Sequence, residues 1–429
     1  MEFFNAIAIP HNEQVLKLLE ILFFIGFSIF VLYFAFLFGG AIISLIYYFK
    51  ATTKNDDYYL NVSKKYLHYV AKGNIAIIGL GLVPLLALYY SLLQFLQKAP
   101  NDFSLAFSVS IALFVFDVII LKVLLFRSKS INFIKPDILY IVLLCLVSLS
   151  SLIIAFISIG VFTICVNGGF QLSAFSFSDF LDSNSIIRYF LFVAIAFIIT
   201  PLSYIFKTYS ADRVSIEGNY FTENGIIKRA LSNVLIVGNI FPILLFISYL
   251  IAPKNLVTLQ NFVFTVTSIL ILLLCIIFSY FSLKENKISF AKYAFVSALV
   301  SFLLLFASDT TLLAVSNKTQ EFKIARDYIT YHEQLLASAG RKTGVQINGE
   351  EIYKAKCVAC HQFDTKLVGP PHKEVLKKYE NRKEDMVKFI LNPVKVDPNY
   401  PPMPNQGLKP QEAEAVVNYM FEHYGPMLK

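Results

Sequence analysis

Long apolar stretches separated by short polar segments make up the first three-quarters of the chain. Each stretch has the roughly 20 residues that a helix needs to cross the hydrocarbon core of a bilayer. There are eight of them, at 17–48, 70–97, 103–126, 138–166, 187–207, 230–252, 261–283 and 292–315. With 56% of its residues hydrophobic, the chain is also too apolar for a soluble protein. The pattern therefore predicts an all-α fold whose residues 1–316 form a polytopic membrane domain.

After the last apolar stretch, the pattern changes to that of a soluble helical domain. Residues 317–344 hold a polar helix, Glu321–Ala339, and we interpret this segment as a helical linker or stalk. Residues 345–429 then show short amphipathic helices, with Asn348 placed to cap the first and Pro410–Tyr424 forming the last. The sequence thus predicts a bundle of about eight transmembrane helices followed by a small all-α domain.

Basic residues gather in alternate connections between the apolar stretches. The connections after the first, third, fifth and seventh stretches are rich in lysine and arginine, whereas those between hold few. The basic residues at these four places are Lys50, Lys54, Lys64, Lys65, Lys122, Arg127, Lys129, Lys135, Lys207, Arg213, Lys228, Arg229, Lys284, Lys287 and Lys292. By the positive-inside rule, both ends of the chain lie outside. The net charge of +8 comes mainly from these inner loops, so it argues for orientation and not for nucleic-acid binding.

Cys357-Val358-Ala359-Cys360-His361 is the most specific motif of the chain. Two thiols separated by two residues can add across the two vinyl groups of a haem, and the histidine that follows can ligate the iron. Two other interpretations are a thioredoxin-like redox pair and half of a zinc site. A zinc site would need a second CxxC or an HxxxH pair, and the sequence has neither. We therefore expect one covalently attached haem c.

The order of elements around this motif resembles that of a class I monohaem cytochrome c. A helix precedes the CxxCH motif, Gly369-Pro370 follows it, Met403 lies in a proline-rich loop, and a helix ends the domain. The resemblance implies that His361 is the proximal iron ligand and Met403 the distal one. It also implies that Gly369 and Pro370 shape the loop over His361, with the Pro370 carbonyl as partner of its second ring nitrogen. Thioether ligation raises the reduction potential, as expected of an electron carrier.

Other methionines and histidines of this domain are candidate ligands too. Met386 falls in a helical stretch and Met420 on the apolar face of the last helix, so both are expected in the core. His372 follows Gly-Pro-Pro and His423 lies near the end of the last helix, and we expect both on the surface. Met403 is therefore the preferred distal ligand.

The start of the membrane domain resembles the first hairpin of cytochrome bd oxidase subunit I. The resemblance rests on the polar turn Thr53–Tyr59, on Ser63–Tyr66 and on Lys72–Gly79. The sequence departs from that family: the haem-ligating histidine of the first span is missing, no Gln-Phe-Gly motif follows, and the outer loop at 253–260 is short. Only His68 lies near an apolar stretch, so no pair of histidines could hold a b haem. The resemblance therefore implies a haem-less relative that serves as a docking scaffold.

Ionisable residues inside the apolar stretches are further candidates for chemistry. Asp117 lies near the middle of the third stretch, Asp309 in the outer third of the eighth and Glu20 near the outer start of the first. A carboxylate within a membrane is costly and usually faces a partner or a water-filled path. These acids are either a proton relay or quinone contact, or paired acids that fix helix packing. The cysteines inside the stretches are expected to be packing residues, and they are Cys145, Cys165 and Cys275.

Together these features predict a membrane-anchored monohaem cytochrome c that acts as an electron-transfer subunit of a respiratory complex. It would relay electrons on the outer, periplasmic face of the bacterial inner membrane, between a quinol-oxidising or soluble donor and a terminal oxidase. Its expected partners are the other subunits of that complex, redox proteins and the lipid membrane, with quinone as a further candidate. This function needs no catalytic residue. The alternative is a cytochrome bd-like oxidoreductase, linked to quinol or cytochrome c, whose membrane half has redox or proton chemistry of its own.

Overall fold

The computed structural model of the chain describes residues 9–71, 73, 77–96, 101–131, 137–167, 177–210, 225–252, 256–338, 348–398 and 400–428. Over these residues the secondary structure is helical and contains no strand, so the predicted all-α fold class is confirmed. The chain divides into two compact units. The first unit holds Lys17–Asn317, and the second holds Ile9–Leu16 with Lys318–Lys429.

Within the described residues, eight helical spans are long and apolar enough to cross a membrane, which is the number that the sequence predicted. The elements that contain them are α2 (Glu13–Lys54), η1 with α5 (Ile78–Leu82 and Val83–Leu96), α6 (Asn101–Arg127), α7 (Ile138–Val166), α9 (Ser183–Ser210), α10 (Ile226–Ile251), α11 (Leu259–Glu285) and α12 (Ile288–Ser338). A short helix, α8 (Phe177–Phe180), precedes α9.

The second membrane span is shorter than predicted, because its expected first residues belong to a separate helix. Val70 lies near the end of α3 (Asp57–Ala71), whereas the span begins at Ile78. Helix α3 is amphipathic: it buries Tyr66 and Val70 and exposes Lys65 and His68. A hydropathy average over a long window does not separate the apolar residues at the end of α3 from the apolar run that follows, so the predicted span began too early. Residues 72 and 74–76 of the quoted Lys72–Gly79 motif lie outside the described residues.

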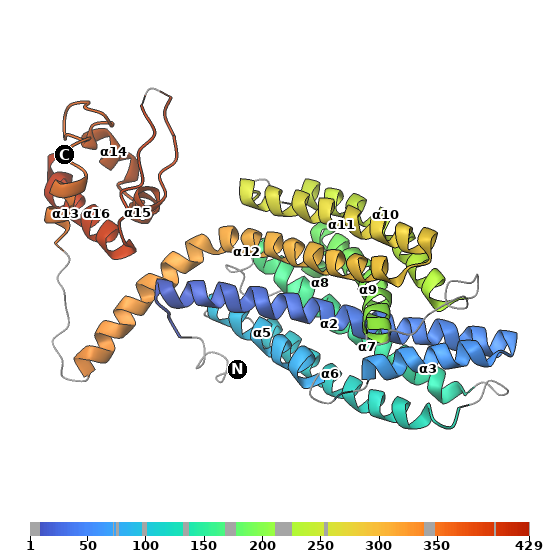
Figure 1. Cartoon of the computed structure of the whole chain (residues 1–429). Helices are drawn as coiled ribbons and strands as arrows, with labels where there is room; N and C mark the ends of the chain where they lie inside the picture. Colours follow the sequence, from blue (N-terminus) through green and yellow to red (C-terminus); the bar gives the residue numbers. More distant parts are fainter. Residues whose placement is uncertain are drawn as a thin grey trace. The chain divides into compact units, whose positions relative to one another are not determined.

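Helix α2 lies at the centre of the first unit. Buried phenylalanines recur along it every three or four residues, at Phe23, Phe27, Phe30, Phe34 and Phe38. The ring of Phe27 lies 4.7 Å from that of Phe162 in α7 and 5.8 Å from that of Phe306 in α12. Figure 1 shows α2 between α12 on one side and α5 and α6 on the other. Aromatic packing around α2 therefore holds several membrane helices together.

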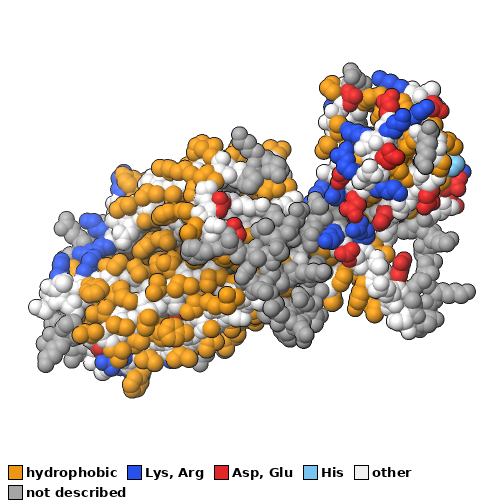
Figure 2. All heavy atoms as spheres, turned by 180° about the vertical axis from the view of Figure 1, so that it is seen from behind, with side chains coloured by type: hydrophobic (Ala, Val, Ile, Leu, Met, Phe, Trp, Pro, Cys, Tyr) orange, Lys and Arg blue, Asp and Glu red, His pale blue; other side chains and the backbone are white. Residues whose placement is uncertain are grey.

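The outer surface of the first unit is apolar. Figure 2 shows hydrophobic side chains over most of its visible face, whereas the visible face of the second unit mixes acidic, basic and apolar groups. This contrast is expected between a unit that faces lipid and one that faces water. The expectation that all three membrane cysteines are packing residues is wrong for Cys145, which is exposed, while Cys165 and Cys275 are buried.

The second unit contains α13 (Gly349–Lys356), α14 (His372–Tyr379), α15 (Lys383–Leu391), α16 (Pro410–Tyr424) and the 3-10 turn η3 (Gly425–Leu428). Asn348 caps α13 as predicted, because its Oδ1 accepts hydrogen bonds from the backbone N–H groups of Glu350 and Glu351, at 3.1 and 3.3 Å. Helix α12 continues past the last membrane span to Ser338, close to the predicted end of the polar helix. The remainder of the expected linker lies outside the described residues.

Helices α13 and α16 pack closely against each other. A buried apolar cluster connects them to α14 and α15, and its members include Tyr353, Leu376, Met386, Val416 and Met420. At the first residue of α13, a Cβ on Gly349 would overlap the backbone carbonyl of Ala415 in α16. The missing side chain at position 349 therefore allows the two helix backbones to approach.

Gly349→Ala is expected to destabilise the second unit by about 1–3 kcal/mol, the usual cost of overpacking. Alanine has the higher helix propensity, by about 1 kcal/mol at most, but the Ala415 carbonyl is part of the backbone and cannot rotate away. The unfolding midpoint of the intact protein, followed by aromatic circular dichroism, measures the effect. Glu351→Ala, at an exposed position of the same helix, is the control. Equal stability of the two variants would contradict the close approach.

Candidate functional site

The CxxCH motif forms a tight turn that extends helix α13. The backbone N–H of Cys357 donates to the carbonyl of Tyr353 at 2.9 Å, continuing the helical pattern. The N–H groups of Cys360 and His361 both donate to the carbonyl of Cys357, at 3.1 and 3.0 Å. The capped helix α13 thus holds both thiols and the imidazole in one hydrogen-bonded turn.

This turn borders a cavity of about 290 Å³ in the second unit. All six residues that the sequence and the family resemblance selected line it: Cys357, Cys360, His361, Gly369, Pro370 and Met403. Most other lining side chains are apolar, among them Val375, Tyr379, Phe389, Ile390, Val394 and Leu408. A cavity near the lower end of the usual ligand-pocket range of about 300–1,000 Å³, with apolar walls and a few polar groups, suits an apolar cofactor.

The His361 imidazole is oriented by the loop that follows the motif. Its Nδ1 lies 3.0 Å from the carbonyl oxygen of Pro370, so Nδ1 carries the proton and donates it in this contact. The other ring nitrogen, Nε2, then keeps its lone pair for a metal ion. The loop itself is held in place because the backbone N–H groups of Val368 and Gly369 donate to the carbonyl of Cys360, at 3.2 and 2.8 Å.

Gly369 is required at this point by the position of the His361 ring. A Cβ on residue 369 would overlap the ring atoms of His361, so any side chain would displace either the loop or the imidazole. The carbonyl of the next residue, Pro370, could then no longer reach Nδ1 at the same distance. The Gly-Pro pair therefore performs two linked tasks: it makes room for the ring and it orients it.

Met403 lies on the proline-rich loop between α15 and α16. This methionine is half-buried at the cavity wall. The loop is tied back to the helices, since the side-chain amide of Asn405 donates to the carbonyl of Leu391 at 3.2 Å. Met386 and Met420 also border the cavity, but both are buried in the apolar cluster, as the sequence predicted. Met403 is thus the cavity-lining methionine outside that cluster.

His372 is not a surface residue, and the prediction for it was wrong. Its ring is only 4% exposed and stacks on that of His361, with centroids 4.9 Å apart and an interplanar angle of 18°. The ring of Tyr353 also lies close to that of His372, with centroids 5.5 Å apart. Neither ring nitrogen of His372 has a hydrogen-bond partner among the described residues. Burial, together with the neighbouring His361, lowers the pKa of His372 to about 4. His423 is exposed, as expected.

The thiol chemistry of the motif differs from that of a redox-active cysteine pair. Burial raises the pKa of the Cys357 thiol to about 11, and the neighbouring Cys360 adds to the shift. Thioredoxin-like pairs depend on a thiolate whose pKa is lowered by a helix N-terminus or a nearby cation. Cys357 instead lies at the C-cap of α13, the end of a helix whose dipole disfavours a thiolate. This environment disfavours the thioredoxin-like interpretation.

The three membrane acids belong to the first unit, and each has different surroundings. Asp117 of α6 is buried and accepts hydrogen bonds from the hydroxyls of Ser150 and Ser151 in α7. Glu20 is half-buried on α2. Among the described residues, no group of three or more His, Cys, Asp or Glu side chains could hold a metal ion.

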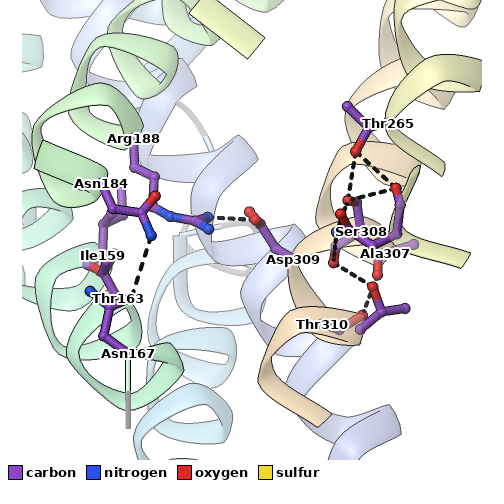
Figure 3. A network of polar contacts seen from close by, with 12 residues as sticks. Ile159, Thr163, Asn167, Asn184, Arg188, Thr265, Ala307, Ser308, Asp309 and Thr310 are labelled. Atoms are coloured by element: carbon purple, nitrogen blue, oxygen red, sulfur yellow. Dashed lines mark hydrogen bonds and ion pairs between the residues drawn. The ribbon is translucent and has the colours of Figure 1, made fainter. Parts of the chain in front are cut away.

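Asp309 of α12 forms an ion pair with Arg188 of α9, a residue that the sequence analysis did not select (Figure 3). The side chains of Arg188 and Asp309 are 7% and 13% exposed. The guanidinium group of Arg188 also lies 5.1 Å from the centroid of the Phe162 ring. The sequence did contain a signal for this ion pair, because Arg188 lies at the start of the fifth apolar stretch and a charge buried there requires a partner.

Comparisons with known proteins concern the second unit. The family model described as cytochrome c matches residues 346–422. Cytochrome c-551 of Pseudomonas denitrificans is 42% identical over 77 residues, which are 17% of this chain and 93% of that protein. Cytochrome c-552 of Hydrogenobacter thermophilus is 32% identical over 92 residues, 20% of this chain and 93% of that protein. No solved structure matches the chain. These findings leave the resemblance to cytochrome bd oxidase without support.

His372→Phe is expected to remove a pH dependence from the stability of the second unit. In the unfolded chain a histidine has a pKa of about 6.5, above the value of about 4 in the fold. As the pH falls from about 6.5 to 4, the unfolded state therefore gains a proton that the folded state does not. This difference lowers the unfolding free energy by about 3 kcal/mol at most.

Unfolding free energies of the intact protein at about pH 7 and pH 4 measure this contribution. The wild type should lose more stability between the two values than His372→Phe does. His423→Phe, at an exposed position, should behave like the wild type. Parallel pH profiles of wild type and His372→Phe would contradict a buried, neutral His372.

Asp309→Leu is expected to destabilise the first unit by about 3–5 kcal/mol, because it leaves the buried Arg188 without its partner. The double variant Arg188→Met/Asp309→Leu should recover most of that loss, since neither charge then remains in the apolar surroundings. Thermal unfolding of the detergent-solubilised protein compares the three proteins. A double variant no more stable than Asp309→Leu would show that the pair does not act as a unit.

Proposed function

Since this chain belongs, through its C-terminal domain, to the cytochrome c family, we propose that it is a membrane-anchored electron-transfer subunit of a respiratory complex. It relays electrons on the periplasmic face of the bacterial inner membrane, between a quinol-oxidising or soluble donor and a terminal oxidase. The observation that carries the proposal is the combination, in one chain, of a cytochrome c domain with eight candidate membrane spans.

The second unit binds one haem c in its cavity. Cys357 and Cys360 would attach the macrocycle, and His361 and Met403 would ligate the iron. Haem c, when bound, supplies an iron centre that gains and loses a single electron. The Pro370 carbonyl holds the His361 ring in the tautomer that leaves Nε2 free, and the Met403 thioether favours the reduced state. The apolar lining keeps water from the iron and helps to set the potential.

The chain is organised as a membrane domain at 1–316, a helical linker at 317–344 and the cytochrome c domain at 345–429. Basic residues in alternate loops place the termini outside, and an even number of spans is consistent with that assignment. The membrane domain anchors the carrier and docks the other subunits. In support of this structural role, Asp117 is hydrogen-bonded to two serines and Asp309 is paired with Arg188.

Lysines around the motif provide a docking surface for an acidic redox partner. Lys356 lines the cavity itself. Lys366 lies over the Tyr400 ring at 4.4 Å, and Lys373 lies 3.5 Å from Asp364. Exposed lysines of this kind raise the rate of encounter with a negatively charged partner, and this effect weakens as ionic strength increases.

Purified protein is expected to contain one haem c per chain, which a pyridine haemochrome assay and reduced-minus-oxidised spectra measure. Met403→His should lower the midpoint potential by on the order of 0.1 V or more, because axial ligands set the potential over a range of about 0.8 V. Met386→Leu and Met420→Leu, which change methionines of the apolar cluster, should leave the potential close to that of the wild type. Cys360→Ala should leave Cys357 as the one thiol of the motif that can attach the haem.

Two results would overturn the proposal. A b-type or d-type band from the isolated chain would mean that the membrane spans hold a redox cofactor, and the alternative of a bd-like oxidoreductase would then be favoured. A potential that responds to Met386→Leu or Met420→Leu but not to Met403→His would assign the distal position to another methionine.

A further inference from the structure

Helix α10 has two faces with different surroundings. One face packs into the first unit, and buried residues recur on it at intervals of three and four, at Ile227, Leu231, Val234, Gly238, Phe241 and Leu245. The opposite face points outward, and Ile236, Ile243, Phe246 and Leu250 on it are between 58 and 63% exposed. Figure 1 shows α10 with α11 at the edge of the first unit. An apolar outward face by itself needs no explanation, because lipid covers it.

Asn239 is the exposed amide nearest the middle of α10; the other, Asn233, lies about 10 Å from the start of the helix. Asn239 lies near the middle of the 26-residue helix Ile226–Ile251, about 20 Å from either end at a rise of 1.5 Å per residue. Its side-chain nitrogen donates one hydrogen bond to the Leu235 carbonyl of the same helix, at 2.7 Å. Among the described residues, its amide oxygen and second N–H have no partner. Lipid tails cannot supply one.

Several amides and hydroxyls elsewhere in the first unit meet partners on a neighbouring helix. Asn261 of α11 donates to Ser308 of α12 at 2.6 Å. Ser268 of α11 meets Ser301 of α12 at 3.1 Å. Against this pattern, an amide directed at the middle of the bilayer indicates that a further helix covers this face of α10.

We propose that two copies of this chain associate through the outward face of α10, with the Asn239 amides of the two copies hydrogen-bonded to each other. Copies inserted with the same topology place Asn239 at the same depth, so the two amides meet without any adjustment along the membrane normal. Each amide offers both a donor and an acceptor, so the pair is self-complementary, as a two-fold interface requires. A different protein would need a matching polar group at that same depth.

The spacing on the outward face also fits a parallel helix pair. Ile236, Asn239, Ile243, Phe246 and Leu250 follow one another at intervals of three, four, three and four residues. This is the repeat with which two helices pack along a common left-handed seam. A single asparagine in such a seam fixes both the register and the number of helices. The two-fold axis of this dimer runs along the membrane normal.

Disulfide cross-linking of the full-length protein in its native membranes tests the interface. Ile243→Cys should form a dimer on oxidation, because residues of the seam face themselves across a two-fold axis. Ile119→Cys on α6, which is equally exposed at 58%, should not. Both substitutions are made in a Cys145→Ser background, because Cys145 is exposed in the same environment. Preferential cross-linking at position 119, or none at 243, would overturn the proposal.

Asn239→Leu in the Ile243→Cys background should reduce the cross-linked fraction about three- to tenfold, the range expected for one interhelical hydrogen bond in a membrane. Asn239→Gln should retain most of it, and Asn233→Leu, at another exposed position of α10, should have no effect. Equal amounts of each full-length variant in the membrane fraction show that its membrane unit is inserted. Cross-linking that is unchanged by Asn239→Leu would overturn the role of the amide. If Asn239→Leu instead released another co-purifying subunit and left the cross-linking between two copies of this chain unchanged, the choice of partner would be overturned.

Discussion

The contact between the His361 imidazole and the Pro370 carbonyl is the interaction on which the candidate haem site depends. It fixes the ring orientation and decides which nitrogen keeps its lone pair. The contact exists only because residue 369 has no side chain, and because the Cys360 carbonyl accepts hydrogen bonds from the loop at 368 and 369. The capped helix α13 and its close approach to α16 hold the motif from the other side. The cavity is thus the result of several short-range constraints that meet at one imidazole.

A different constraint governs the membrane helices, where polar groups have no water to bind. Several described polar side chains between the helices have partners on neighbouring helices: Asp117 with two serines, Asp309 with Arg188, Asn261 with Ser308. Such pairs fix helix positions, since breaking one leaves a polar group in apolar surroundings.

Local signals in the sequence predicted much of this structure. The Asn348 cap, the bounds of α16, the eight spans and the burial of Met386 and Met420 all follow from periodicity, capping and hydropathy, which depend on near neighbours in the chain. The burial of His372 does not, because it results from the packing of α14 against the motif turn and Tyr353. The Arg188–Asp309 pair joins residues 121 positions apart and could not be inferred from spacing alone. The start of the second span was wrong because α3 is amphipathic, a property that an averaged hydropathy hides.

The exposed amide of Asn239, whose one hydrogen bond stays within its own helix, gains its meaning from the same rule that explains the paired residues. Hydrophobicity alone cannot distinguish a helix face that meets lipid from one that meets another helix, because both are apolar. A polar group can, since only a protein neighbour satisfies it at that depth. The haem domain presents the opposite case: in water an exposed amide or lysine is ordinary, and a buried, unpartnered group such as His372 is the informative one. In the membrane unit an exposed polar group, and in the water-facing unit a buried polar group without a hydrogen bond, is therefore the best indication of what lies next to it.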